Sequence, residues 1–241
     1  AAEEVAPSRT KKIKVTFNAT HCMYDVITES IEARGWKVVR SETKAPMCNL
    51  HWLDQSGIME WFRRVEPWMK INHYPGMHNA LARKTCLARN MARMQRHFPV
   101  EYNFLPQTWI VPNEMIDFEK QFDEFGKAKT IFIAKPDAGT QGRGIFLTNE
   151  LSKIKAAAAD RETGLLVVQR YIGKPMLIEG LKFDLRLYFL VGSKLQGEGL
   201  EPRFFLFRDG LVRLCTTEYT PPTLENLDQK RMHLTNYAIN K

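Results

Sequence analysis

The first part of the chain alternates between strand-like and helix-like hydrophobic patterns. Apolar and polar residues alternate over 12–17, which predicts a half-buried strand. Apolar residues then recur at helical spacing over 24–31, and the short runs at 36–39 and 49–53 predict two further strands. Because strand, helix and strand follow one another closely, we expect a small N-terminal α/β domain over 11–75.

The middle of the chain shows a longer helical pattern, followed by alternating strands and helices. The helical pattern covers 78–97, where Leu87, Met91 and Met94 share one face. Beyond it the periodicity predicts strands at 103–111, 130–134 and 165–171 and helices at 113–125 and 151–160. We therefore expect mixed α/β structure here.

Period-two patterns dominate after Gly180. They predict strands at 181–191, 203–208 and 211–217, with a hairpin turn at Asp209-Gly210 between the last two. The sequence therefore predicts a late antiparallel sheet.

One of these strands carries its charges on a single face. The period of two separates the apolar residues of 181–187 from Lys182, Asp184 and Arg186, and Arg213 on a neighbouring strand would extend the charged face. This face is either the wall of a charged cleft or the wet side of an ordinary sheet, and the pattern alone does not choose between them.

Composition and charge narrow the function classes. The 241 residues are 44% hydrophobic, with 14 Gly and 12 Pro and no repeat, which excludes collagen, coiled-coil rods and disordered tails. A net charge of +8 favours acidic partners such as nucleic acid, phosphate cofactors or acidic protein tails. Four widely spaced cysteines favour a reducing compartment, and no apolar run is long enough for a membrane span.

A basic stripe lies on the helix predicted over 78–97. Arg89, Arg93 and Arg96 share one face, which is either a contact for an acidic partner or a solvated surface, the more frequent case. The histidines His51 and His97 stand alone, so we expect them to be structural or surface groups rather than metal ligands.

A glycine-rich loop follows the strand predicted at 130–134. Lys135 precedes this loop, and Arg143 and three glycines lie within 139–144. Glycines allow exposed backbone N–H groups and the two cations add positive charge, so the loop could cover a polyphosphate. The alternative is an ordinary glycine-rich hairpin, because the segment matches neither G-x-G-x-x-G nor the Walker pattern.

Several segments, in their order along the chain, resemble the tubulin tyrosine ligase-like family. They are 70–76, 83–84, 108–112, 134–136, 141–145, 169–172, 182–186, 209–213 and 233–237. The resemblance extends from Asn72 to the last residue, and it is strongest to the tubulin polyglutamylases of the elongating type.

The resemblance implies an α/β (α+β) ATP-grasp fold with a small N-terminal α/β domain. The domains expected on this basis are a disordered tail at 1–10, the N-terminal domain at 11–75, a central ATP-grasp subdomain at 76–172 and the start of the C-terminal subdomain at 173–241. The C-terminal part of the grasp is expected to be truncated. The family's metal ligands, an Asp and a Glu-x-Asn motif, would then lie beyond Lys241, which leaves no metal ligand in this chain.

The resemblance also assigns roles to individual residues. Residues implied to bind the nucleotide are Lys84, Lys135, Gln141, Gly142, Gln169, Arg170, Tyr171, Ile172, Lys182, Phe183, Asp184, Thr235 and Asn236, with 169–172 as the hinge against the adenine. Those implied to act in catalysis are Lys84, Arg186 and Arg213. Those implied to bind the substrate are Gln141, Arg213, Tyr237 and Ala238.

The implied reaction is ATP-dependent amino-acid ligation with ATP and Mg²⁺ as cofactors. An acceptor carboxylate becomes an acyl phosphate, and the amine of free L-glutamate displaces the phosphate on the acidic C-terminal tails of tubulin. Gln141 resembles the chain-elongating enzymes, whose initiating relatives carry Arg. The alternatives are a non-catalytic module that binds microtubules or nucleotide, an initiating glutamylase, or a glycylase.

We expect the protein to be a monomer in the cytoplasm, associated with the cytoskeleton of the cilium, axoneme or basal body. We expect it to bind neither nucleic acid nor membrane.

Overall fold

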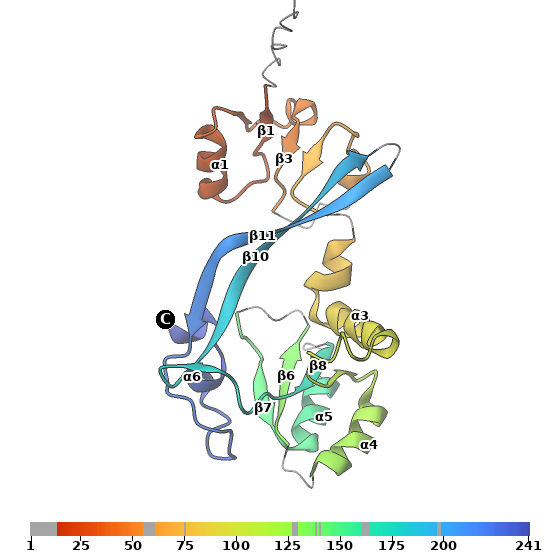
Figure 1. Cartoon of the computed structure of the whole chain (residues 1–241), viewed down its shortest axis with the longest axis vertical. Coiled ribbons are helices and arrows are strands. Elements are labelled where there is room, and N and C mark those ends of the chain that lie inside the picture. Colours follow the sequence, from red (N-terminus) through yellow and green to blue (C-terminus); the bar gives the residue numbers. More distant parts are fainter. Residues whose placement is uncertain are drawn as a thin grey trace, which may run out of the picture. The chain divides into compact units, whose positions relative to one another are not determined.

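The computed structural model describes residues 14–54, 61–74, 76–126, 130–137, 139, 141–160, 164–196 and 199–241. The chain divides into two compact units, Ala1–Pro75 and Gly76–Lys241 (Figure 1). The tail expected over 1–10 and the first residues of the strand expected over 12–17 lie outside the described residues. In the described part of the chain no helix is both long and apolar enough to span a membrane.

The first unit contains a parallel sheet with the strand order β2-β1-β3-β4. The strands are β1 (Thr16–Asn18), β2 (Lys37–Val39), β3 (Leu50–His51) and β4 (Lys70–Ile71). Helix α1 (Asp25–Glu32) follows β1, and a short 3-10 helix, η1 (Ala45–Met47), precedes β3. Phe17, Ala19 and Ile31 form the buried core. The expected helix over 24–31 and the strands at 36–39 and 49–53 are confirmed, although the strands are shorter.

His51 is a structural group of this first unit, as expected. Its side chain is fully buried, and its ring nitrogens lie 3.1 Å from Asn18 Nδ2 and 2.9 Å from the Cys48 carbonyl oxygen. Both nitrogens therefore have a hydrogen-bond partner.

The second unit is built on an antiparallel sheet with the strand order β5-β8-β6-β7. These strands are β5 (Thr108–Val111), β6 (Phe132–Pro136), β7 (Phe146–Thr148) and β8 (Leu166–Arg170). Helices α4 (Met115–Gly126) and α5 (Leu151–Ala159) cover one face, where Trp109, Phe118, Phe132, Ile154 and Leu166 pack together. The periodicity located all of these elements except β7, and β5 begins later than the strand expected over 103–111.

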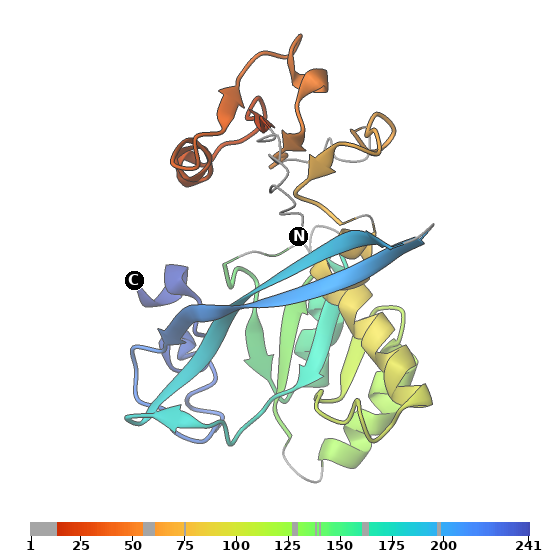
Figure 2. The same cartoon turned by 45° about the horizontal axis from the view of Figure 1, so that its top comes forward.

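The opposite face of this sheet carries two groups of helices. Helix α3 (Lys84–His97) lies beside β5 and β8 (Figure 2). Helices α6 (Lys230–His233) and α7 (Tyr237–Asn240) lie in the segment that packs on Ile133 and Leu147 through Leu234 and Ile239. The single helix expected over 78–97 is wrong at its start: a π-helix, η2 (His78–Ala82), precedes α3, and Arg83 between them is extended.

Two long antiparallel strands follow the short strand β9 (Leu177–Ile178). They are β10 (Leu181–Gln196) and β11 (Gly199–Leu214), and they pair side by side along their length (Figure 1). The hairpin turn expected at Asp209-Gly210 is wrong, because both residues lie within β11. The pairing shifts at this point: Leu187 faces Gly210 and Phe189 faces Leu206, so one residue of β10 opposes three of β11. A bulge inside the strand, not a turn, accommodates the Asp-Gly pair.

This β10–β11 ribbon has one continuous apolar face. The residues that alternate onto it from β10 are Phe183, Leu185, Leu187, Phe189 and Val191, and their partners on β11 include Leu214, Val212, Leu206 and Phe204. Leu185, Phe189 and Leu206 are each more than half exposed. The alternation predicted from sequence is present, but it does not bury this face within the described residues.

Candidate functional site

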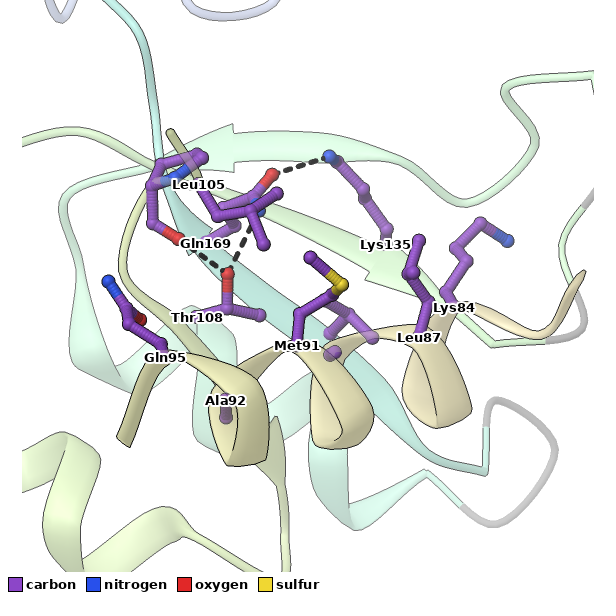
Figure 3. A pocket seen from close by; sticks show the side chains of 12 residues that line it. Lys84, Leu87, Met91, Ala92, Gln95, Leu105, Thr108, Lys135 and Gln169 are labelled. Carbon is purple, nitrogen blue, oxygen red and sulfur yellow. Dashed lines mark hydrogen bonds between the residues drawn. The ribbon is translucent and has the colours of Figure 1, made fainter. Parts of the chain in front are cut away.

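A partly buried lysine lies at the centre of the sheet face that α3 covers. Phe132 and Ala134 point into the core under α4 and α5, so the alternation of β6 places Lys135 on the opposite face. Its Nζ donates a hydrogen bond to Gln169 Oε1 (2.9 Å), and Gln169 Nε2 donates to Thr108 Oγ1 (2.9 Å), as Figure 3 shows. Burial, and then the charge of Lys84, lowers the pKa of Lys135. Gln169 and Thr108 therefore hold the Lys135 ammonium in place through two successive hydrogen bonds.

Lys84, the first residue of α3, anchors the loop that follows β6. Its Nζ donates to the carbonyl oxygens of Pro136 (2.7 Å), Asp137 (3.2 Å) and Gly139 (2.7 Å). In return, Asp137 Oδ1 accepts hydrogen bonds from the backbone N–H and the hydroxyl of Thr85, both at 3.0 Å. The start of α3 and the glycine-rich loop are therefore tied together by both side chains. The expected contact of Lys84 with phosphate stays a prediction.

A pocket of about 360 Å³ lies between α3 and the sheet (Figure 3). Its apolar walls come from Leu87, Met91, Leu105, Pro106 and Val167. Its polar groups are Lys84, Gln95, Thr108, Lys135 and Gln169. A second pocket, of about 610 Å³, shares Gln95, Leu105 and Pro106 with the first and continues to Arg170, Tyr171, Ile172 and Gly173. The two pockets thus form one groove that runs from the lysines to the segment expected to be the hinge.

The glycine-rich loop adopts backbone conformations that favour glycine. Gln141 has φ 58°, Gly142 φ +82° and Gly144 φ +69°. A Cβ atom on Gly142 would lie 2.6 Å from Ile239 Cδ1 and 3.1 Å from Asn236 Oδ1. The loop therefore lies so close to Ile239 and Asn236 that a Cβ atom here would force a side chain or the loop to shift, and the positive φ also favours glycine. Ala138 and Thr140 of the same loop lie outside the described residues.

Lys182, at the start of β10, is a third desolvated lysine. Its Nζ donates to the Tyr171 hydroxyl (2.8 Å) and to the His233 carbonyl oxygen (3.0 Å). Burial lowers the pKa of Lys182 to about 8. The electrostatic effect of Lys135 also lowers this pKa, whereas those of Cys215 and Asp184 raise it. Lys84 lowers the pKa of Lys135, and Lys135 lowers that of Lys182, so Lys135 lies within Coulombic range of both other lysines.

Asp184 and Arg213 form a two-bonded ion pair on the charged face of the ribbon. Arg213 Nε donates to Asp184 Oδ1 (2.7 Å) and Arg213 Nη2 donates to Asp184 Oδ2 (2.5 Å), while Thr235 Oγ1 donates to Oδ2 (2.9 Å). Burial alone would raise the pKa of Asp184, but the hydrogen bonds from Arg213 and Thr235 and the charge of Arg186 lower it. Neither pocket described above is lined by Asp184, Arg186 or Arg213, so the choice between the two interpretations of this face stays open.

The structure brings most of the expected site residues onto this one side of the second unit. Tyr237 and Ala238 are exposed on α7, and their expected contacts with substrate stay predictions, as does the role of Gln141. Sequence reasoning missed Thr108, Asp137 and His233 as contributors. Thr108 and His233 each gave a signal, since they lie in 108–112 and 233–237, two of the segments that carry the resemblance, whereas Asp137 lies in none of them.

The described residues do not supply a metal site. They contain no group of three or more His, Cys, Asp or Glu side chains that could hold an ion. The described part of the chain therefore supplies no site made of protein side chains alone for the implied Mg²⁺.

A mixed α/β fold, a groove lined by lysines and a glycine-rich loop over the sheet define an ATP-grasp-like domain. Residues 63–241 match the tubulin-tyrosine ligase family. The chain belongs to this family.

Relatives are similar over most of this chain. It is 42% identical to tubulin polyglutamylase ttll6 of Danio rerio, over 95% of the chain and 27% of that protein. It is 45% identical to a probable beta-tubulin polyglutamylase of Tetrahymena thermophila, over 80% of the chain and 15% of that protein. It is 40% identical to tubulin polyglutamylase TTLL13 of Homo sapiens, over 97% of the chain and 26% of that protein. The chain spans about a quarter or less of the length of these relatives.

Proposed function

We propose that this chain carries the nucleotide-binding part of an ATP-dependent ligase that adds glutamate to tubulin. The observation that carries the proposal is a pocket lined by Lys84 and Lys135, with Lys182 close enough to Lys135 for the two charges to interact. Desolvated cations that repel each other in this way are unfavourable unless an anion of high charge joins them. A triphosphate has that charge.

ATP would lie along the groove with its phosphates at Lys135 and Lys182. The hinge segment Gln169, Arg170, Tyr171 and Ile172 lines the other end, where the adenine would bind. The glycine-rich loop with Gln141 and Gly142 would cover the phosphates through its backbone N–H groups. Lys182, Phe183 and Asp184 would hold ribose and phosphate, and Thr235 and Asn236 would complete the pocket. In this arrangement we place the central subdomain at 76–172 and the start of the C-terminal subdomain at 173–241.

The chemistry follows from the positive charge. An oxygen of the acceptor carboxylate bonds to the γ-phosphorus of ATP, and ADP leaves. The ammonium group of free glutamate first loses one proton to solvent, and the resulting amine attacks the acyl carbon. The bond from this carbon to the phosphate oxygen then breaks, and phosphate leaves with the second proton. Arg186 and Arg213 would stabilise the transferred phosphoryl group and bind the carboxylate of the incoming amino acid, because guanidinium groups match both anions.

The acceptor we propose is an acidic C-terminal tail of tubulin. The relatives are named as tubulin polyglutamylases, which supports this substrate, and a net charge of +8 favours an acidic partner. Gln141, Arg213, Tyr237 and Ala238 would contact the amino acid or the acceptor. We further propose that the enzyme elongates existing glutamate chains, because position 141 is Gln, the residue type of the elongating relatives. We also propose that it is a monomer associated with the cytoskeleton of the cilium, axoneme or basal body.

The proposal is tested by removing the central cation from the natural protein. Lys135→Ala should abolish both ATP binding and the incorporation of glutamate into tubulin. The matched control is Lys153→Ala, because Lys153 is exposed and only pairs with Glu150 at 2.8 Å. Unchanged incorporation by Lys135→Ala would contradict the proposal. If the unsubstituted protein binds ATP but incorporates no glutamate, the non-catalytic alternative replaces the ligase.

A further inference from the structure

Three elements of the second unit meet in a largely buried polar cluster, and the proposed function uses its tyrosine and its lysine but not its histidine. Tyr171 follows β8, Lys182 begins β10 and His233 ends α6. Tyr171 is 9% exposed and His233 is 2% exposed. The Tyr171 hydroxyl lies 2.9 Å from His233 Nδ1 and 2.8 Å from Lys182 Nζ, and the Lys182 ammonium also lies 4.5 Å from the centre of the Tyr171 ring. The His233 ring is thus linked through the Tyr171 hydroxyl to Lys182 of the candidate site.

The partners of His233 assign its tautomer. Nε2 lies 3.0 Å from the carbonyl oxygen of Asn226, which can only accept, so Nε2 carries the proton. Nδ1 is then an acceptor, and the Tyr171 hydroxyl donates a hydrogen bond to it. Burial lowers the pKa of His233, and the nearby Lys182 lowers it further, which favours the neutral ring. Because the hydroxyl proton is directed at His233, the lone pairs of the Tyr171 oxygen face the ammonium of Lys182.

This arrangement restricts a side chain that is otherwise flexible. A lysine ammonium sits on a four-carbon stem and loses rotamer entropy when it binds a ligand. Here the Tyr171 hydroxyl and the His233 carbonyl oxygen take two of its three N–H bonds. Among the described residues these are its hydrogen-bond partners, so the third N–H remains for an anion. Lys84 differs, since three carbonyl oxygens already take its N–H bonds.

We propose that His233 is a positioning residue: acting through Tyr171, it orients Lys182 toward the phosphates of the nucleotide. This inference rests on the proposed function, because it takes ATP as the ligand of Lys182. His233 itself does not reach the nucleotide. Its ring fixes the hydroxyl of Tyr171, and its carbonyl oxygen fixes the ammonium, so both contacts pre-organise the lysine before the ligand arrives.

Two substitutions of His233 separate this role from simple packing. His233→Asn retains an acceptor at the position of Nδ1, and so keeps the bond from Tyr171. His233→Gln retains a donor at the position of Nε2, and so keeps the bond to Asn226. A positioning role predicts that Gln raises the KM for ATP about tenfold, the loss expected for one charge-assisted hydrogen bond, and that Asn raises it less. A purely structural role predicts no such order.

Tyr171→Phe tests the same inference without emptying the core. The ring stays, only the oxygen that accepts from Lys182 is lost, and the KM for ATP should again rise about tenfold while the KM for glutamate is unchanged. The measurement is steady-state glutamate incorporation by the natural protein, with ATP binding measured by calorimetry. An unchanged KM for ATP in Tyr171→Phe, or an equal effect of Asn and Gln at position 233, would overturn the inference. If the unsubstituted protein neither binds ATP nor incorporates glutamate, the proposed function itself fails.

Discussion

Asp184 and Arg213 stand directly opposite each other on β10 and β11, and the guanidinium donates two parallel hydrogen bonds to the carboxylate. Their side chains are 37% and 32% exposed, so solvent screens the pair. Ion pairs with this exposure contribute about 0.2–1 kcal/mol to the free energy of unfolding. The geometry of the pair therefore serves the site more than the stability of the fold.

The first prediction concerns Arg213→Lys. Lysine keeps the charge but cannot make the two-bonded contact, so the position of the cation that would bind the amino acid is lost. We expect kcat/KM for glutamate to fall at least about tenfold, while the free energy of unfolding changes by less than about 1 kcal/mol. Glutamate incorporation and urea unfolding measure the two quantities. The control is Arg89→Lys on the exposed face of α3, and an equal loss in both variants would contradict the prediction.

The second prediction is a pH dependence of ATP binding. Burial lowers the pKa of Lys182 to about 8, so its ammonium loses the proton as the pH rises through that value. Only the protonated form attracts phosphate, and a bound anion raises the pKa again. ATP binding should therefore weaken above pH 8 and should take up protons there.

Calorimetry in two buffers of different protonation enthalpy measures this proton uptake. Lys182→Arg is the control, because a guanidinium stays charged over the whole range. If the arginine variant shows the same dependence on pH, another group is responsible.

The third prediction concerns Gly142→Ala. The residue has φ +82°, and a Cβ atom would lie 2.6 Å from Ile239 Cδ1. Gly164 has φ +65° but no atom within 4 Å of such a Cβ, so Gly164→Ala isolates the backbone cost, about 1–2 kcal/mol. Gly142→Ala should destabilise the protein more than Gly164→Ala, and it alone should weaken ATP binding. Equal unfolding free energies for the two variants would show that the loop can move away from α7 without cost.

The fourth prediction concerns the choice between initiation and elongation. Gln141 is exposed in the loop near the site, so its side chain is free to contact an acceptor. Gln141→Arg should shift activity from pre-glutamylated tubulin peptides toward unmodified ones. Both residues must adopt φ 58°, so the substitution leaves the strain of the loop unchanged. The ratio of rates on the two peptides is the measurement, and an unchanged ratio would count against an elongating role.

The sequence predicted the elements of the second unit where the local pattern agreed with the final packing. The strand expected over 165–171 is β8, in which Leu166 and Val168 pack against α4 and α5 and alternate with Val167 and Gln169. The prediction failed at Asp209-Gly210, because pairing with β10 overrode a strong local turn signal.

The candidate site was predictable as residue types but not as contacts. Lys84 binds carbonyl oxygens more than fifty residues away, and no local pattern encodes such a partner. Asp137 was missed for the same reason, since its bonds to Thr85 join two distant segments. The resemblance to a family supplied the order of the motifs, and the folded chain supplies the hydrogen bonds between them.

The irregularity in the β10–β11 ribbon limits how this hairpin can change in length. Tyr188 opposes three residues of β11, so β11 has two extra residues at this point. Because side chains alternate with a period of two, two extra residues leave the same face of β11 apolar before and after the irregularity. Pairs of residues can therefore be gained or lost at this point while the apolar side stays continuous. A single inserted residue would turn every side chain beyond it to the opposite face, and would bring charged groups such as Arg203 and Glu201 among the phenylalanines.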